Sequence, residues 1–352
     1  MKNNEKAIIG ALLGCAVGDA LGLPYEGLSR QRAGRMLGEP LKYRFCFGKG
    51  MISDDTEHTC MTAAALAASG GDPDIFAQHL AKSLRYWLLG LPAGVGFATL
   101  RAVLRLWIGM GPLRSGVFSA GNGPAMRSPI IGATVNEIEQ LAPLVSACTR
   151  ITHTDPKAYY GAYAIALAAY LARSGKPVEP TRYHHELEKN LKDCSEEFRA
   201  LIKQVIRAAK SGVSVGRFAK ELGLQNGITG YVYHSVPTVL HCWLRHQTNY
   251  SKAVTKIIRC GGDTDTTAAM VGAIVGSGVG PEGIPGNLLN NIMEYPRSVA
   301  WMKRLGQETA CAAAEKRNIT VTPYCRSAVI PRNLFFLAVV LFHGFRRLLP
   351  PY

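Results

Sequence analysis

The sequence contains no Cys-x-x-Cys pair, and its nine cysteines are scattered singly along 352 residues. The number is odd and several cysteines lie in apolar runs, so a disulfide framework is not indicated. A zinc site is not indicated either, because no set of Cys and His residues has the spacing of zinc ligands. We therefore expect a protein of a reduced compartment and predict the cytoplasm.

Acidic residues are few, with 25 Asp and Glu against 40 Lys and Arg, and the formal net charge is +15. Such a charge favours a polyanionic or phosphate-bearing partner. No long Lys/Arg run interleaved with aromatic residues occurs, so nucleic acid is an alternative partner that the pattern does not favour. The hydrophobic fraction of 47% is typical of a folded protein with a sizeable core.

The chain also lacks an uninterrupted apolar run of the roughly 20 residues that a membrane-spanning helix needs. The C-terminal stretch Leu334 to Phe345 is strongly apolar but shorter, and two arginines follow it. We predict no transmembrane segment there but a docked terminal helix, with an interfacial membrane anchor as the alternative. Near the N-terminus, Asp19 interrupts the apolar stretch, so we do not interpret it as a signal peptide.

Alternation of apolar and polar residues, which marks β-strands, never extends over more than a few residues. Helical periodicity covers most of the chain, and no linker divides it. The sequence therefore predicts an all-α, compact single domain over residues 1–325, followed by an apolar and basic C-terminal tail over 326–352. Glycine-rich residues 109–132 are predicted to form a long functional loop, and 181–222 a pair of surface helices. Further helices are expected over residues 5–21, 55–69, 74–88, 96–108, 135–148, 156–173, 234–247, 251–259 and 264–279.

Two clusters of acidic and hydroxyl side chains stand out in this acid-poor chain. Residues 53–56 (Ser-Asp-Asp-Thr) and 263–266 (Asp-Thr-Asp-Thr) each precede an Ala-rich apolar helix. Capping explains one such side chain at each helix, and a helix N-terminus favours negative charge by only a fraction of a kcal/mol. A second carboxylate is not explained in this way, because adjacent carboxylates repel each other, above all when they are partly buried.

A hard divalent cation would remove this repulsion, and Mg²⁺, Mn²⁺ and Ca²⁺ all prefer oxygen ligands. The Gly261-Gly262 pair gives the backbone the freedom to turn sharply, so that Asp263 and Asp265 can both face one ion. Two such clusters together predict a divalent metal site.

Other residues carry weaker signals. Glu26 follows the end of the first helix and is either a solvated loop acid or an acid/base or metal-linked carboxylate. The stretches 94–96 and 119–127 could offer backbone N–H groups to phosphates, or they could be plain turns. Neither has the Lys-Ser/Thr pair of a P-loop, so ATP hydrolysis is not indicated. Capping explains Asp155, which precedes a proline, but not His153, which is either structural or a substrate ligand.

In this order the elements resemble the ADP-ribosylglycohydrolase family over roughly residues 7–285. Each matching stretch is short, and their succession is what makes the resemblance specific. The stretches are GALLGCAVGDALGLPYEG, SDDTEHT, GVGFATL, GNGPAMR, THTDPKA, GITGYV and GGDTDTTAAMVGAIVG.

The resemblance implies an all-α fold with a central dimetal site that holds two Mg²⁺ or Mn²⁺ ions. It assigns Ser53, Asp54 and Asp55 to one ion, makes Asp265 a bridging ligand, and completes the pair with Asp263 and Thr266.

The resemblance also implies a catalytic set of Glu26, Asp54 and Asp55. Asp54 or Asp55 would be the base, and Glu26 a mobile residue that assists proton transfer. Phosphate binding falls to two glycine loops, and His153 would contact the substrate near its adenosyl side. The loop residues are Gly94, Gly96, Ser119, Gly121, Asn122 and Gly123. Three residues depart from the family pattern: Ser53 stands for Thr, His58 for Met, and Ala120 for Tyr, which puts a phosphate or ring contact at 120 in doubt.

On this basis we predict a monomeric, bacterial hydrolase that cleaves ADP-ribose from modified protein side chains, with arginine favoured, at the ribose C1″ atom. Its partners would be the ADP-ribosylated protein and the ADP-ribose product. The alternatives are hydrolysis of another ADP-ribose linkage (serine, poly(ADP-ribose) or nucleic acid) and a non-catalytic ADP-ribose-binding protein.

Overall fold

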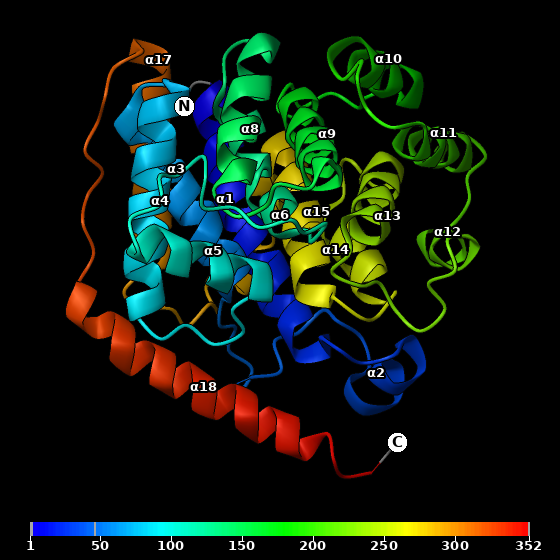
Figure 1. Cartoon of the computed structure of the whole chain (residues 1–352). Helices are drawn as coiled ribbons and strands as arrows, with labels where there is room; N and C mark the ends of the chain where they lie inside the picture. The colour runs from blue at the N-terminus through cyan, green and yellow to red at the C-terminus, as the bar shows by residue number, and fades with distance from the viewer. Residues whose placement is uncertain (1–2, 46, 351–352) are drawn as a thin grey trace.

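The computed structural model describes residues 3–45 and 47–350, and helices account for most of them (Figure 1). Within these residues β structure is limited to isolated bridges, and the predicted all-α fold is confirmed. Eight of the nine cysteines are described, and all eight are free thiols; Cys46 lies outside the described residues. The helices are α1 (Asn3–Gly22), α2 (Arg30–Leu37), α3 (Asp54–Ser69), α4 (Pro73–Leu89), α5 (Phe97–Trp107), α6 (Gly123–Arg127), α7 (Pro129–Thr134), α8 (Leu141–Arg150), α9 (Pro156–Ala172), α10 (Pro180–Asn190), α11 (Glu196–Lys210), α12 (Val215–Glu221), α13 (Val232–Arg245), α14 (Tyr250–Ile258), α15 (Thr264–Val279), α16 (Gly286–Leu289), α17 (Val299–Glu315) and α18 (Val329–Arg346).

Helices α1 and α15 pack against each other in the middle of the molecule, and the other helices surround them (Figure 1). Their contact is made of backbone rather than side chains. A Cβ atom on Gly14 would lie 2.2 Å from the carbonyl oxygen of Gly272, and one on Gly272 would lie 2.2 Å from that of Gly14. The contact repeats every four residues, the spacing that keeps residues on one helix face. The facing pairs are Gly10 with Gly276, Gly14 with Gly272, Gly18 with Ala268, and Gly22 with Thr264.

This seam fixes the position of the predicted site. At its last contact, the Thr264 hydroxyl donates to the carbonyl oxygen of Gly22 (2.8 Å). The C-terminal end of α1 therefore meets the N-terminal end of α15. The segment that carries Glu26 follows the first of these helices, and Asp263 and Asp265 open the second.

Two predicted segments differ from the structure. The stretch 109–132 is not a loop throughout, because α6 and α7 begin in it, each with a proline in its first turn, where the missing N–H is tolerated. Residues 181–222 form three helices rather than two. Ser195 and Ser214 cap the second and third by accepting hydrogen bonds from backbone N–H groups, and these caps divide the periodic pattern.

A buried ionic network joins α3, α4 and the segment before α17. Glu57 accepts hydrogen bonds from Arg297 Nη1 (2.5 Å) and from Trp87 Nε1 (2.5 Å). The side chains of Glu57 and Arg297 are each only 2% exposed, so this pair is removed from water. Beside it, Arg332 of α18 is paired with Glu294 (2.7 Å). The C-terminal helix is thus attached to the core through charge.

Replacing Arg297 with methionine is expected to lower the free energy of unfolding by about 3–5 kcal/mol, because Glu57 would be left buried without its main counter-charge. Urea denaturation monitored by circular dichroism measures the loss. The control is Arg317→Met, which removes the exposed ion pair with Glu315. Such pairs contribute little, so a loss in the control equal to that of Arg297→Met would contradict the prediction.

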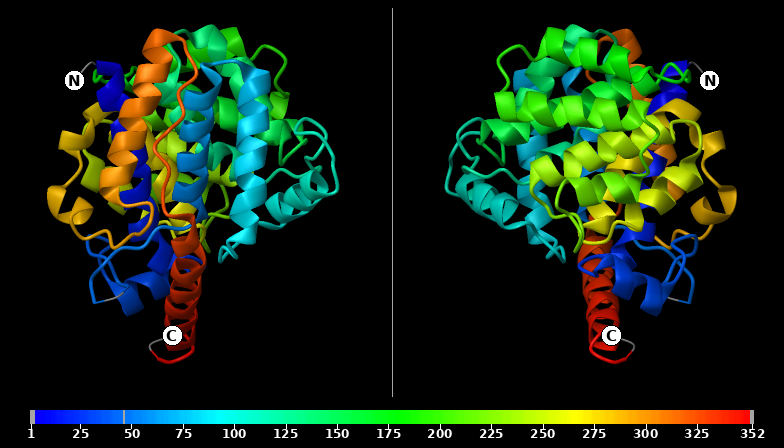
Figure 2. Two further views of the ribbon diagram at one scale, coloured as in Figure 1. Left: turned by 90° about the vertical axis from the view of Figure 1, so that its left-hand side faces the viewer. Right: turned by 90° about the vertical axis from the view of Figure 1, so that its right-hand side faces the viewer.

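Helix α18 runs along one edge of the molecule and extends past its body in both side views (Figures 1 and 2). Its apolar stretch is longer than the sequence analysis predicted. By length and composition two segments could cross a membrane, Asn4–Tyr25 and Arg326–Arg346. The first is entirely buried and forms the central helix, whereas only 17% of the second is buried.

Candidate metal centre

The two acidic clusters meet in space although 211 residues separate them. Ser53 is the N-cap of α3, and its Oγ accepts a hydrogen bond from the N–H of Asp55 (3.4 Å). Asp55 Oδ2 accepts from the hydroxyls of both Ser53 (3.3 Å) and Thr266 (3.2 Å). The hydroxyl of one cluster therefore binds a carboxylate of the other, and the N-terminal ends of α3 and α15 face a shared site.

The turn that precedes α15 is held by backbone hydrogen bonds on two sides. Gly261 and Gly262 adopt φ values of 76° and 82°, which only glycine adopts without strain. The N–H of Gly27 donates to Gly262 (2.8 Å), and the N–H of Asp263 donates to Ile228 (2.8 Å). These bonds set the segment that carries Glu26 beside Asp263.

Burial and crowding shift the titration of these carboxyl groups. Burial raises the pKa of Asp54, Asp55 and Asp265 well above the usual range, and the charges of the neighbouring carboxylates raise it further. For Asp55 the neighbours are Asp54, Asp19 and Asp263. For Asp265 they include Glu26. The carboxylates of both loops thus sense one another, and the cluster is costly without a cation.

Two carboxylate oxygens of the cluster also lack a partner that would stabilise their charge. Asp55 Oδ1 and Asp265 Oδ1 are buried and have no hydrogen-bond partner within the described part of the chain. Across residues 3–45 and 47–350, no three His, Cys, Asp or Glu side chains form a ready-made cage around a single point. The donors are nonetheless hard oxygens, with carboxylate atoms left unsatisfied, and this chemistry fits Mg²⁺ or Mn²⁺.

These shifts give a pH dependence with a definite sign. A raised pKa for a buried carboxyl favours folding below the usual pKa of about 4, and the benefit is lost as the pH rises through the raised values. The metal-free protein is therefore expected to lose stability as the pH rises above about 4 and through the raised pKa values, of which that of Asp19 is about 6. Added Mg²⁺ or Mn²⁺ binds the ionised carboxylates, so its increment in Tm is expected to grow over the same window.

Thermal unfolding with EDTA and with excess metal, at about pH 5.5 and about pH 8, measures both effects. A metal increment in Tm that is equal at the two pH values, or larger at the lower one, would contradict the assignment. Calcium serves as the comparison ion, because it binds oxygen ligands at longer distances.

Asp19 of α1, which interrupts the N-terminal apolar stretch of the sequence, lies beneath the site. Its Oδ2 accepts from the N–H of Ser53 (2.9 Å) and from the N–H (3.2 Å) and hydroxyl (2.5 Å) of Thr56. It caps α3 from a different helix. Burial raises its pKa to about 6, and its other oxygen has no partner in the described residues. The presence of a single carboxylate in an otherwise apolar helix was the sequence feature that could have indicated this role.

The second glycine loop, residues 119–123, contacts the acidic cluster through Asn122. Its Nδ2 donates to Asp263 Oδ2 (2.7 Å), and its N–H donates to the carbonyl of Gly230 (2.9 Å). The Ser119 hydroxyl accepts from the N–H of Gly121 (3.3 Å), which closes the start of the loop. The sequence analysis did not place the Gly227–Tyr231 stretch at the site. It packs against this loop through the hydrogen bond of Gly230 and a bridge between Gly121 and Tyr231.

His153 lies directly under this loop and is buried. A Cβ on Gly121 would lie 3.0 Å from His153 Nε2, so a larger residue at 121 would have to displace the ring by a few tenths of an ångström. Nδ1 of the ring is 2.9 Å from the Thr152 hydroxyl, and burial together with the charge of Arg127 lowers the pKa of His153 to about 3. The imidazole is therefore neutral.

The first glycine loop, residues 94–96, lies near the second loop, with Thr99 between them. The Thr99 hydroxyl would lie 3.9 Å from a Cβ on Gly96 and 3.8 Å from a Cβ on Gly123. Gly94 has a φ of 76°, and Gly96 is the exposed N-cap of α5. Thr99 thus lies between Gly96 of the first loop and Gly123 of the second.

Glu26 lies at the rim of the site, and the residue is exposed. Partial desolvation of its carboxyl group raises the pKa of that group, and the charge of Asp263 raises it further. Arg347 opposes this shift with its positive charge. The guanidinium of Arg347 donates to the carbonyl oxygens of Glu26 (2.6 Å) and Pro24 (2.8 Å). Nothing in the local sequence predicted this contact, because 321 residues separate Arg347 from Glu26.

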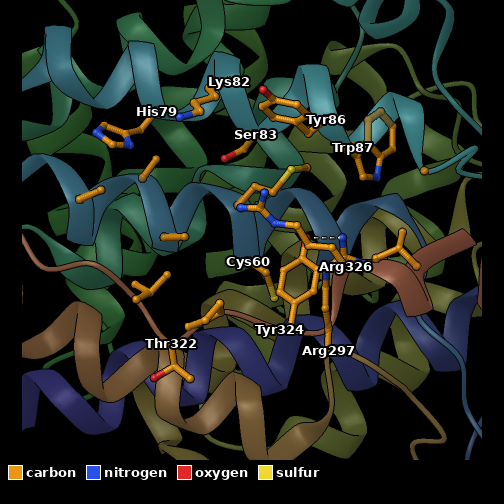
Figure 3. A pocket seen from close by; sticks show the side chains of 18 of the residues that line it. Cys60, His79, Lys82, Ser83, Tyr86, Trp87, Arg297, Thr322, Tyr324 and Arg326 are labelled. Atoms are coloured by element: carbon orange, nitrogen blue, oxygen red, sulfur yellow. Dashed lines mark hydrogen bonds between the residues drawn. The ribbon is translucent and has the colours of Figure 1, made fainter.

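A cavity of about 600 Å³ lies elsewhere, between α3, α4 and residues 320–330 (Figure 3). Cys60, Trp87, Arg297 and Tyr324 are among its lining residues, and none of the residues assigned above to the acidic cluster or the glycine loops lines it. It is a separate feature of the molecule.

The chain is similar to known proteins in both sequence and fold. A sequence model of the ADP-ribosylglycohydrolase family matches residues 1–318. The ADP-ribosyl-(dinitrogen reductase) glycohydrolase of Rhodospirillum rubrum is 30% identical over 302 residues, which is 83% of this chain and 92% of that protein. ADP-ribosylhydrolase ARH3 of Gallus gallus is 26% identical over 324 residues, covering 78% of this chain and 86% of that one. A solved ADP-ribosylglycohydrolase-related protein complex has the same fold, with a TM-score of 0.64 at 24% identity, covering 89% of this chain and 100% of that one.

Proposed function

The chain belongs to the ADP-ribosylglycohydrolase family, and on this premise we propose that it releases ADP-ribose from modified protein side chains, with arginine as the favoured acceptor. The observation that carries the proposal is the paired acidic cluster, whose unsatisfied carboxylate oxygens lie next to a glycine loop. That combination suits a substrate that presents ribose hydroxyls on one side and a diphosphate on the other.

We propose that the cluster holds two Mg²⁺ or Mn²⁺ ions. When bound, such ions would polarise the hydroxyls of the distal ribose and lower the pKa of a water molecule. The residues that would hold them are Ser53, Asp54, Asp55, Asp263, Asp265 and Thr266.

The two glycine loops would hold the diphosphate through backbone N–H groups. In the second loop these would be groups other than the N–H of Gly121 and of Asn122, which donate to Ser119 and Gly230. Asn122 fixes the distance between the diphosphate and the cluster, because it is bonded to Asp263. His153 would donate from Nε2. Arg127 can only donate, so the Thr152 hydroxyl accepts from it (2.7 Å) and is free to donate a hydrogen bond to Nδ1. Nδ1 is then the acceptor nitrogen of the neutral ring, and the ring proton is on Nε2.

Hydrolysis breaks the bond between ribose C1″ and the acceptor atom, and a water oxygen takes the acceptor's place. A carboxylate, Asp54 or Asp55, would remove the proton from that water. Glu26 would transfer a proton to the leaving nitrogen or oxygen, a role that its raised pKa and its exposed position at the rim support.

The decisive experiment is a panel of arginine-linked, serine-linked and DNA-linked ADP-ribose, assayed with each metal and with EDTA. The proposal expects release of ADP-ribose from the arginine-linked substrate only when metal is present. The DNA-linked substrate is included because a net charge of +15 favours polyanionic partners. Tight ADP-ribose binding without turnover of any substrate would instead indicate a binding protein.

A further inference from the structure

Helix α18 leaves most of its large apolar side chains exposed, whereas an ordinary surface helix buries its apolar face. The residues that face the protein recur every three or four positions and combine apolar side chains (Phe336, Val339, Val340) with polar ones (Asn333, His343, Arg347). The residues that face solvent are large and apolar. They are Ile330 (45% exposed), Leu334, Phe335, Leu337, Leu341, Phe342 (77%) and Phe345 (66%), followed by Leu348 and Leu349.

Polar contacts hold the inner face in place, so the helix is docked in a defined orientation. Asn333 Nδ2 donates to the carbonyl of Gly90 (2.7 Å), and Arg332 is paired with Glu294. At the other end, His343 Nε2 lies 3.0 Å from the Pro24 carbonyl oxygen, which also accepts from Arg347. Rotation of the helix to bury its apolar face would break all of these contacts.

The charge of this segment has one sign. From residue 316 to the end of the chain there is no Asp or Glu, whereas six residues are Lys or Arg. Arg326 lies just before the helix, and Arg346 is exposed at its C-terminal end. A large apolar face with cations at both ends matches the interface of an anionic bilayer, where acyl chains lie beneath negative headgroups.

The cavity of Figure 3 borders the N-terminal end of this helix and has the same character. Val329 and Ile330 line it together with Leu89, and the cations among its lining residues include Lys82 and Arg326. Asp and Glu are absent from the described residues that line it. The acid-free, apolar surface therefore continues from α18 to α4.

We propose that α18 lies in the plane of a membrane surface and binds anionic phospholipid, with its solvent-facing Leu and Phe side chains inserted among the acyl chains. A second copy of the chain is a poorer occupant of this face, because two acid-free cationic segments would repel each other. A spanning orientation is a poorer one too, because it would expose the hydrogen-bonded groups of the inner face to lipid.

Flotation of the full chain with vesicles tests the proposal. We expect binding to vesicles of phosphatidylcholine mixed with phosphatidylglycerol, and at least about tenfold weaker binding to phosphatidylcholine alone. Phe342→Glu, a change at a position that is already exposed, is expected to reduce binding to the mixed vesicles by about tenfold or more. High salt is expected to reduce it as well.

The matched control is Ile75→Glu, which places the same charge on an exposed apolar residue at the far end of α4. It is expected to bind like the unmodified chain. The proposal is overturned if neither vesicle binds, or if Phe342→Glu and Ile75→Glu bind alike. It is also overturned if ultracentrifugation shows a dimer that Phe342→Glu converts to a monomer, or if alkaline carbonate fails to release the bound protein, as for a spanning helix. Release of ADP-ribose by the variants in solution is read separately, so failure here leaves the proposed function untouched.

Discussion

Asparagine in place of Asp265 is expected to lower the rate of ADP-ribose release by about 10²–10³-fold, while it raises the Tm of the metal-free protein. The two effects have one cause. Asp265 is buried among Glu26, Asp55 and Asp263, and its charge is favourable only when a cation is bound. Removal of that charge relieves the repulsion in the empty cluster and weakens the binding of the ion that the reaction needs.

The opposite signs separate this prediction from a general loss of folding, which would lower both activity and Tm. The control is Asp72→Asn, which alters the N-cap of α4 and leaves a side chain that can still cap. It is expected to retain both activity and metal response. An Asp265→Asn variant that hydrolyses at the rate of the unmodified protein, or one that keeps its full Tm increment with metal, would refute the metal assignment.

Alanine in place of Gly14 is expected to destabilise the protein by about 3 kcal/mol or more, at the upper end of overpacking costs. The added Cβ would lie 2.2 Å from the Gly272 carbonyl oxygen, so the two central helices must move apart. Because this seam also joins the end of α1 to the start of α15, metal affinity is expected to fall along with stability.

Gly34→Ala is the matched control. Gly34 lies in helix α2 at an exposed position, and nothing would lie within 4 Å of the new Cβ. Alanine is the better helix former, so this variant is expected to be unchanged or more stable by about 0.5–1 kcal/mol. Urea denaturation of both variants provides the comparison, and equal stabilities would show that the seam can relax.

The parts of the fold that could be predicted were those with a local signal. Apolar periodicity located α3, α9 and α15, and Asp155 with the following proline predicted the start of α9, where Asp155 Oδ1 accepts from the N–H of Lys157 (2.9 Å). α6 and α7 were missed because each is only five or six residues long, too short for a period to show. The full length of α18 was not predicted, because the sequence analysis considered only the apolar stretch Leu334 to Phe345. The helix begins five residues earlier, at Val329.

For the site, the sequence predicted which residue types gather but not what holds them together. The acid-poor composition made the two Asp clusters conspicuous, and the order of the motifs linked them to Glu26 and His153. The support beneath them could not be predicted. Asp19 acts across two helices, and Arg347 comes from a tail beyond residue 318, where the family match ends.

The close contact of α1 with α15 also has a consequence during synthesis. Gly14 is made early, but its partner Gly272 follows 258 residues later (272 − 14). At about 5–20 residues per second, the partner follows only after roughly 13–50 s, and until then the glycine face of α1 lacks the helix that it packs against. A nascent chain that stops before residue 264 leaves that face of α1 uncovered. We expect such fragments to depend on ribosome-associated chaperones, and the catalytic centre to form only once translation is nearly complete.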